Sequence, residues 1–161
     1  MDKLFVGKIV GFHGVKGELK VVTDFQMKEK VFVKNNDIII GEETFKITSV
    51  RIHKNNYLIT LNGMLDLNLV DKYIKSDVFY LRDNLSLTKD EFLYSDLIGF
   101  KVMDCEKEIG TVNSISHNNV NVFLEVKGEK KFLIPFIEVF VGNVDLDNKI
   151  VETINGGELI I

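Results

Sequence analysis

Short runs of β-branched and aromatic residues, separated by turn residues, are the feature that most constrains how this chain can fold. In the first half the runs are Phe5–Val10, Glu18–Thr23, Lys30–Val33, Asp37–Ile40, Thr44–His53, Tyr57–Leu61 and Val78–Tyr80. Asparagine and glycine pairs such as Asn62-Gly63 separate them, which is typical of tight turns between strands. Because closing such a sheet removes its exposed edges, we expect a small six-stranded barrel.

The pattern starts again in the second half. There the expected strands are Phe100–Met103, Glu108–Ser116, Asn121–Val126, Lys131–Ile134, Glu138–Val141 and Ile150–Thr153. The single proline, Pro135, has no N–H for a ladder and should end the fourth of these strands. Between the halves lies a polar stretch, Leu81–Asp90, that we interpret as the linker. The prediction is an all-β chain with two small barrels, residues 1–85 and 86–161.

One stretch has a helical pattern instead. In Asp66–Lys75 the aspartate can cap a helix, and the apolar side chains of Leu69, Val70, Tyr73 and Ile74 fall at helical spacing. We expect this helix to cover one end of the first barrel.

A glycine-rich segment lies between the first two expected strands. Gly11, Gly14 and Gly17 follow one another at three-residue spacing, and glycine reaches positive φ at little cost. The spacing predicts a shaped hairpin loop that presents Phe12, His13 and Lys16, with Lys20 on the following strand. Such a loop could contact phosphate, or its glycines could serve the turn alone.

The sequence does not match the motifs of the known enzyme and cofactor sites that we considered. The glycine-rich segment is not followed by a helix, as a P-loop or a dinucleotide fingerprint requires, and a KH clamp would have to join two helices. Cys105 is the only cysteine and follows an aspartate, which does not activate a thiol. Three scattered histidines show no metal-ligand spacing. We therefore predict neither enzyme activity nor a metal nor a cofactor.

Hydrophobic patterning and charge bear on location and partners. No run of about 18 uncharged apolar residues and no signal-peptide core occurs, so we expect a cytoplasmic protein without a membrane contact. Residues 1–85 carry 13 Lys/Arg and 11 Asp/Glu, whereas residues 86–161 carry 7 lysines and 13 Asp/Glu. A mildly basic half can approach phosphate, and an acidic half suits a basic protein partner.

Six segments occur in an order and spacing typical of one protein family: Val6–Val22, Asp96–Gly99, Ile109–Val112, Leu133–Phe136, Val144–Leu146 and Gly157–Ile160. Together they resemble the RimM family, whose members are bacterial ribosome maturation factors. The resemblance implies an N-terminal six-stranded barrel similar to the second domain of translation elongation factors and a C-terminal PRC barrel. It also implies a monomer that binds the free small (30S) ribosomal subunit and assists late head assembly and 16S rRNA processing.

The resemblance further implies where partners bind. Contact with ribosomal protein S19 of the subunit head is attributed to the C-terminal barrel, near a tyrosine pair that precedes the Asp-Leu-Ile-Gly motif. Here the pair is replaced by Phe92-Leu93, followed by Tyr94, so two hydroxyls are lost and an aromatic ring is kept. The expected partner-binding residues are therefore Phe92, Leu93, Tyr94 and Asp96. In the glycine-rich segment, Phe12 replaces the family's usual proline.

An enzyme whose residues converge from distant segments would need a pocket that holds paired titratable groups. Two other hypotheses about function follow from the residues and the resemblance. In the first, the acidic C-terminal barrel binds a basic ribosomal protein while His13, Lys16 and Lys20 face phosphates of 16S rRNA. In the alternative, the chain is an adaptor whose PRC barrel binds a non-ribosomal protein, because a fold alone does not determine a partner.

Overall fold

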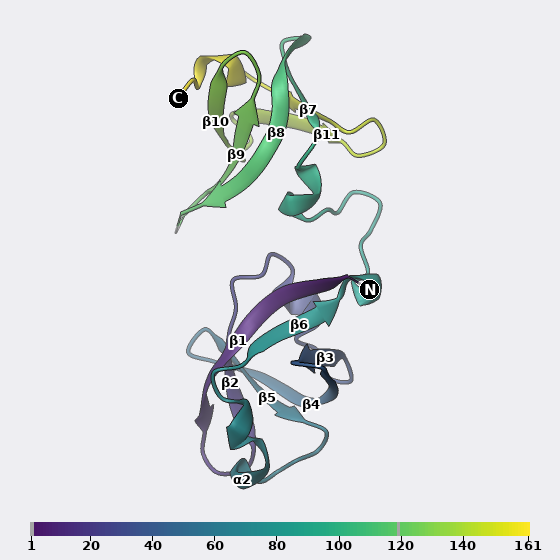
Figure 1. The fold of residues 1–161 in the computed structure, drawn as a ribbon, viewed down its shortest axis with the longest axis vertical. Coiled ribbons are helices and arrows are strands. Elements are labelled where there is room, and N and C mark those ends of the chain that lie inside the picture. Colours follow the sequence, from purple (N-terminus) through teal and green to yellow (C-terminus); the bar gives the residue numbers. More distant parts are fainter. Residues whose placement is uncertain (1, 119) are drawn as a thin grey trace. The chain divides into compact units, whose positions relative to one another are not determined.

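The computed structural model describes residues 2–118 and 120–161. The chain divides into two compact units, one ending at Leu87 and the other comprising Thr88–Ile161. Figure 1 shows the first unit in purple to teal and the second in teal to yellow. Both are built mainly from strands, and each contains one six-stranded sheet, so the predicted all-β fold class is confirmed.

The N-terminal unit is a closed barrel whose strands follow the order β1-β2-β5-β4-β3-β6. Their bounds are β1 Lys3–His13, β2 Glu18–Val22, β3 Asp37–Ile40, β4 Glu43–His53, β5 Asn56–Leu61 and β6 Asp77–Leu81. The long first strand pairs with β2 through its C-terminal half and with β6 through its N-terminal half. The ring is completed between β3 and β6 by the single pair Ile39↔Phe79.

The core of this barrel explains its strand pattern. Ile9, Leu19, Ile47 and Ile59 come from four different strands and are fully buried. Along β5, five consecutive residues from Tyr57 to Leu61 are buried, because the strand lies between β2 and β4 and is covered on both faces. Continuous burial of this kind replaces the alternating pattern of a strand with one face in water.

The prediction of a strand at Lys30–Val33 is wrong. These residues overlap the short helix α1, Lys28–Val31. The buried side chains nearby are Met27, Val31 and Phe32, a spacing that matches a helical turn rather than alternation. The amide of Asn36 donates to the carbonyls of Lys30 and Val31 at 2.9 and 3.0 Å, so side-chain hydrogen bonds satisfy the end of this helix.

The glycine-rich segment forms the expected hairpin but with a shorter loop. β1 continues to His13, which pairs with Glu18, so only residues 14–17 form the turn. Gly14 and Gly17 have φ of +68° and +85°, whereas Gly11 has no positive φ and marks a β-bulge. Phe12 and His13 therefore lie on a strand and point to opposite faces, rather than sharing a loop.

The predicted helix near residue 70 is present in two short pieces, α2 Leu67–Val70 and a 3-10 turn, Asp71–Tyr73. Asp66 caps it by accepting from the Asn68 N–H at 2.9 Å. Val70 is fully buried, but Leu69 is exposed, so the expected apolar face is narrower than predicted. The Leu67 N–H donates to the Val15 carbonyl at 3.0 Å and connects α2 to the β1–β2 turn.

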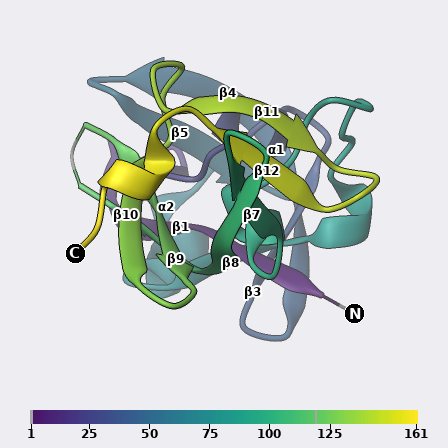
Figure 2. The same cartoon turned by 90° about the horizontal axis from the view of Figure 1, so that it is seen from above.

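The C-terminal unit is a six-stranded sheet in the order β10-β9-β8-β7-β12-β11. Its strands are β7 Lys101–Asp104, β8 Lys107–His117, β9 Val122–Lys127, β10 Lys131–Pro135, β11 Val141–Asp145 and β12 Ile150–Thr153. β7 and β12 pair in parallel, and the other neighbours are antiparallel. Figure 2 shows the sheet curving around its core, with the short 3-10 turn Gly156–Glu158 beside β10.

Two sequence expectations concern the same stretch of this sheet. β10 ends at Pro135, as predicted from the missing N–H. The expected strand Glu138–Val141 is wrong, because residues 137–140 form a turn in which Phe140 and Val141 both donate to the Ile137 carbonyl. The strand begins at Val141 instead. Ile137 and Val139 are exposed, which explains how apolar residues misled the prediction.

The core of the C-terminal unit is compact. Leu97, Val102, Leu124, Ile134 and Val151 are fully buried and come from four strands and the 3-10 turn Tyr94–Leu97. Phe92, Phe136 and Phe140 pack against this cluster while remaining partly exposed. In the described part of the chain, every helix is too short or too polar to cross a membrane.

Candidate functional site

Three aromatic rings form the most distinctive surface of the C-terminal unit. Phe92 and Tyr94 precede β7, and Phe136 follows β10. Their ring centroids are 5.2 Å apart for Tyr94 and Phe136, 6.0 Å for Phe92 and Phe136, and 6.3 Å for Phe92 and Tyr94, all in edge-to-face arrangement. Aromatic groups that are packed together and still partly exposed are common anchors in protein interfaces.

These rings line a groove of about 770 Å³. Strand β11 and, in the turn after β10, Ile137 and Glu138 line it as well. Charged side chains along the groove are mainly acidic: Asp90, Glu138, Asp145 and Asp147 stand against Lys89. The groove therefore combines an apolar wall with a negative potential, a combination suited to a cationic partner.

Asp145 is held in its ionised form by the turn that follows β11. Its carboxylate accepts from the side-chain amide of Asn148 at 2.8 Å and from the Asn148 backbone N–H at 3.1 Å. These two hydrogen bonds, the side-chain one first, lower the pKa of Asp145. The negative charge at this end of the groove is therefore retained into acidic solution.

The four predicted partner-binding residues do not play equal parts in this surface. Phe92 and Tyr94 line the groove. The side chain of Leu93 is 3% exposed and packs inward beneath them. Asp96 is half-buried, and its carboxylate accepts from the Leu93 N–H at 3.2 Å. Leu93 and Asp96 thus hold the segment that carries the two partly exposed rings.

A second candidate surface lies on the N-terminal barrel, where cationic side chains of β1, β2 and β4 meet. The imidazoles of His13 and His53 are 4.8 Å apart between ring centroids. Desolvation is the largest cause of a lowered pKa at His53, and positive charge lowers that pKa further, from His13, Lys54, Arg51 and Lys20. That combination places several cations around one imidazole. We call Lys20, Arg51 and Lys54, together with the imidazoles of His13 and His53 among them, the cation cluster.

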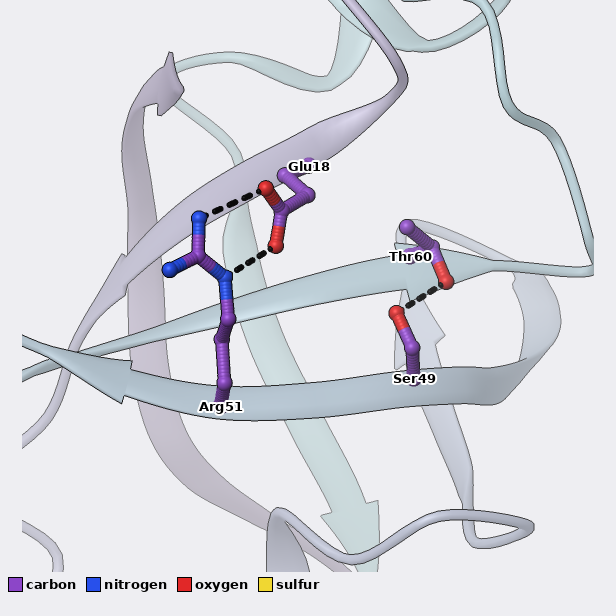
Figure 3. A network of polar contacts seen from close by, with 4 residues as sticks. All are labelled: Glu18, Ser49, Arg51 and Thr60. Carbon is purple, nitrogen blue, oxygen red and sulfur yellow. Dashed lines mark hydrogen bonds and ion pairs between the residues drawn. The ribbon is translucent and has the colours of Figure 1, made fainter. Parts of the chain in front are cut away.

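One carboxylate, that of Glu18, pairs with Arg51 of the cluster (Figure 3). Glu18 on β2 accepts from Arg51 Nε at 2.7 Å and from a terminal guanidinium nitrogen at 2.9 Å, a bidentate pair across the sheet. The hydrogen bond from Arg51, followed by the charges of Arg51 and the two histidines, lowers the pKa of Glu18 despite partial burial. On the same strand as Arg51, Ser49 bonds the buried hydroxyl of Thr60 at 2.7 Å and joins β4 to β5.

The four residues predicted to face phosphate are therefore only partly brought together. His13 and Lys20 belong to the cation cluster. Lys16 is exposed in the turn, and Phe12 is 51% exposed on the opposite side of the strand from His13. Sequence reasoning missed Arg51 and His53, although their two-residue spacing on a predicted strand already placed them on one face.

Comparison with known protein families covers nearly the whole chain. The model of the RimM N-terminal domain matches residues 4–85, and that of the RimM PRC barrel domain matches residues 94–159. A ribosome maturation factor RimM from Staphylococcus epidermidis is 37% identical over 158 residues, covering 91% of this chain and 92% of the relative. RimM proteins of Exiguobacterium sibiricum and Oenococcus oeni are each 35% identical over 156 residues. Those alignments cover 92–94% of this chain and 92–93% of the relatives.

Both halves of the fold, each with its own six-stranded sheet, thus correspond to the two domains of one family, in the same order along the chain. The motifs that first suggested this resemblance lie in both matched regions. The chain belongs to the RimM family.

Proposed function

We propose that this chain is a ribosome maturation factor that binds the free small ribosomal subunit and assists late assembly of its head and processing of 16S rRNA. The observation that carries the proposal is the identity of 37% to a protein named ribosome maturation factor, over nine tenths of both chains. The proposal places the protein in the cytoplasm, where subunits assemble, and it assigns a binding role rather than a chemical step.

In this proposal the C-terminal unit binds ribosomal protein S19 of the head. Two features support the assignment: the packed rings of Phe92, Tyr94 and Phe136, and the four carboxylates around the same groove. Residues 86–161 carry 7 lysines against 13 Asp/Glu, so this half attracts a basic protein as a whole. Long-range attraction of this kind acts mainly on the association rate and on partner choice.

The N-terminal unit faces phosphates of 16S rRNA through Lys16 and the cation cluster. The difference between a mildly basic N-terminal half and an acidic C-terminal half suits a single monomer that contacts both RNA and a basic protein. We further propose that residues 1–85 and 86–161 are the two binding modules. Producing the halves separately and measuring subunit binding by each would assign the contacts.

Sedimentation tests the proposal directly. The chain should co-sediment with purified free small subunits and not with whole ribosomes. If the chain co-sediments with neither free small subunits nor whole ribosomes, the proposal is refuted and an adaptor for another protein is favoured.

The RNA contact has its own test in the salt dependence of subunit binding. Lys16→Ala should reduce the slope of log affinity against log salt by roughly one unit, the effect of one lost phosphate contact. Lys34→Ala, an exposed lysine outside the turn and the cluster, serves as the matched control and should leave the slope unchanged. Equal slopes for both variants would show that the glycine-rich turn does not face phosphate.

A further inference from the structure

We propose that the groove of the C-terminal unit is a strand-addition site, in which an extended, lysine- or arginine-rich segment of a protein pairs with the open edge of β11. This inference rests on the proposed function, because both assign a basic protein partner to the same unit. It goes further by stating the conformation of the bound segment and the backbone that receives it.

The groove includes the whole of an end strand. All five residues of β11, Val141 to Asp145, border it. Successive side chains of a strand point to opposite faces, and the N–H and C=O groups point to the sides. Because β11 is the last strand of its sheet, one of its sides lies beside the groove without a paired strand among the described residues.

The two ends of the sheet are treated differently by the chain itself. β10 is one end strand, and residues near the C-terminus cover it: Leu133 N–H donates to the Leu159 carbonyl at 3.0 Å, and Ile161 N–H donates to the Lys131 carbonyl at 2.8 Å. β11 is the other end strand and pairs with β12 but with no further strand among the described residues. An edge of this kind is a template for a strand from another molecule.

The aromatic and acidic side chains that line the groove suit the side chains of such a strand. Phe92, Tyr94 and Phe136 would receive apolar side chains on one face of the added segment. Glu138, Asp145 and Asp147 lie around the strand edge and would pair with lysine or arginine side chains. Because the side chains of a strand alternate between two faces, a segment of alternating basic and apolar residues can contact both the aromatic rings and the carboxylates of the groove.

Backbone hydrogen exchange of the full chain, free and bound to purified small subunits, tests the inference. Strand addition should slow by about tenfold or more the exchange of those β11 amides that face away from β12, because these gain a hydrogen bond. The Val141 amide, which already donates to the Ile137 carbonyl, should change less. Binding with unchanged exchange in β11 would overturn the inference and leave the proposed function intact. A failure to bind subunits would instead count against the proposed function.

A synthetic probe tests the inference without the ribosome. The probe is an acetylated, amidated octapeptide of alternating lysine and valine, compared with two versions methylated on the odd or the even backbone nitrogens. The parent should slow β11 exchange, and one methylated version should bind at least about tenfold more weakly than the other, because only one side of a strand faces the edge. Equal binding by all three, or no binding of the parent at about 1 mM, would overturn the inference.

Charge variants complete the test. Replacing Glu138 and Asp147 by lysine should weaken binding of the probe about tenfold or more. The matched control replaces Glu129 and Glu158 by lysine, two exposed carboxylates outside the groove, and should leave binding unchanged. Equal weakening by both would indicate a general charge effect and overturn the assignment to this groove. A concentration-dependent dimer formed through β11 would also overturn it, because the occupant would then be a second copy.

Discussion

Gly17→Ala should destabilise the N-terminal barrel by far more than the same change at Gly14. Both glycines have positive φ, which costs an alanine about 1–2 kcal/mol. A Cβ at Gly14 would meet open space, whereas one at Gly17 would lie 2.2 Å from the Met64 carbonyl oxygen. Relieving that overlap requires a shift of about 1 Å and disrupts the hydrogen bond between Leu67 N–H and the Val15 carbonyl, worth about 1 kcal/mol.

These terms predict losses of about 1–2 kcal/mol for Gly14→Ala and about 2–3 kcal/mol for Gly17→Ala. For a unit of this size, each kcal/mol lowers the melting temperature by about 4–8 °C. Because the cost of positive φ is common to both, calorimetry of the full chain should separate the two variants by about 4–8 °C in the transition of the N-terminal unit. Equal melting temperatures would refute the argument, because they would mean that the turn does not pack closely against residues 64–67.

Three further predictions concern stability. Leu124→Ala, at a fully buried position of the C-terminal core, should lower the free energy of unfolding by about 2–5 kcal/mol in urea titrations, and a loss below about 1 kcal/mol would contradict the packing described here. The pKa of His53 is lower in the folded state, so the unfolded state binds a proton at higher pH and the free energy of unfolding should fall as the pH drops below 6.5. His53→Gln should flatten that decline. An unchanged pH profile of stability in the variant would contradict this prediction. Glu18 also has a lowered pKa, so its contribution is present above pH 4.5 and lost in more acidic solution. Glu18→Gln should remove that acid dependence and lower stability at neutral pH by the same small amount, because Arg51 is half exposed; an acid dependence that survives in the variant would contradict this.

Strands with strong β-branched patterns could be predicted from the sequence because local preference and burial agree there. The run Tyr57–Leu61 is an example: it is buried along its whole length and was recognised by composition alone. Residues 30–33 show the opposite case. Val31 and Phe32 have high strand preference, yet the packing of Met27 with them requires a helical turn. A helix of four residues spans only about one turn, so the sequence is too short there to show a helical period.

The candidate sites were harder to predict because they depend on pairing between distant segments. His13 and His53 are 40 positions apart, and only the order of β1, β2, β5 and β4 brings them together. The same holds for Phe136, whose contact with Tyr94 depends on how β10 and the segment before β7 are arranged. The aromatic residues before the Asp-Leu-Ile-Gly motif were found through family resemblance, and the carboxylates of the groove were found only in the structure.

The carboxylates beside β11 have a consequence for the solubility of the free protein. An uncovered strand edge is a hazard at cellular concentrations, since two copies can join through it and begin to aggregate. Glu138, Asp145 and Asp147 would face the same charges on an approaching copy, so like-charge repulsion discourages self-association while leaving the edge open to a cation-rich chain. Concentrated salt screens this repulsion and should make the protein more prone to precipitate.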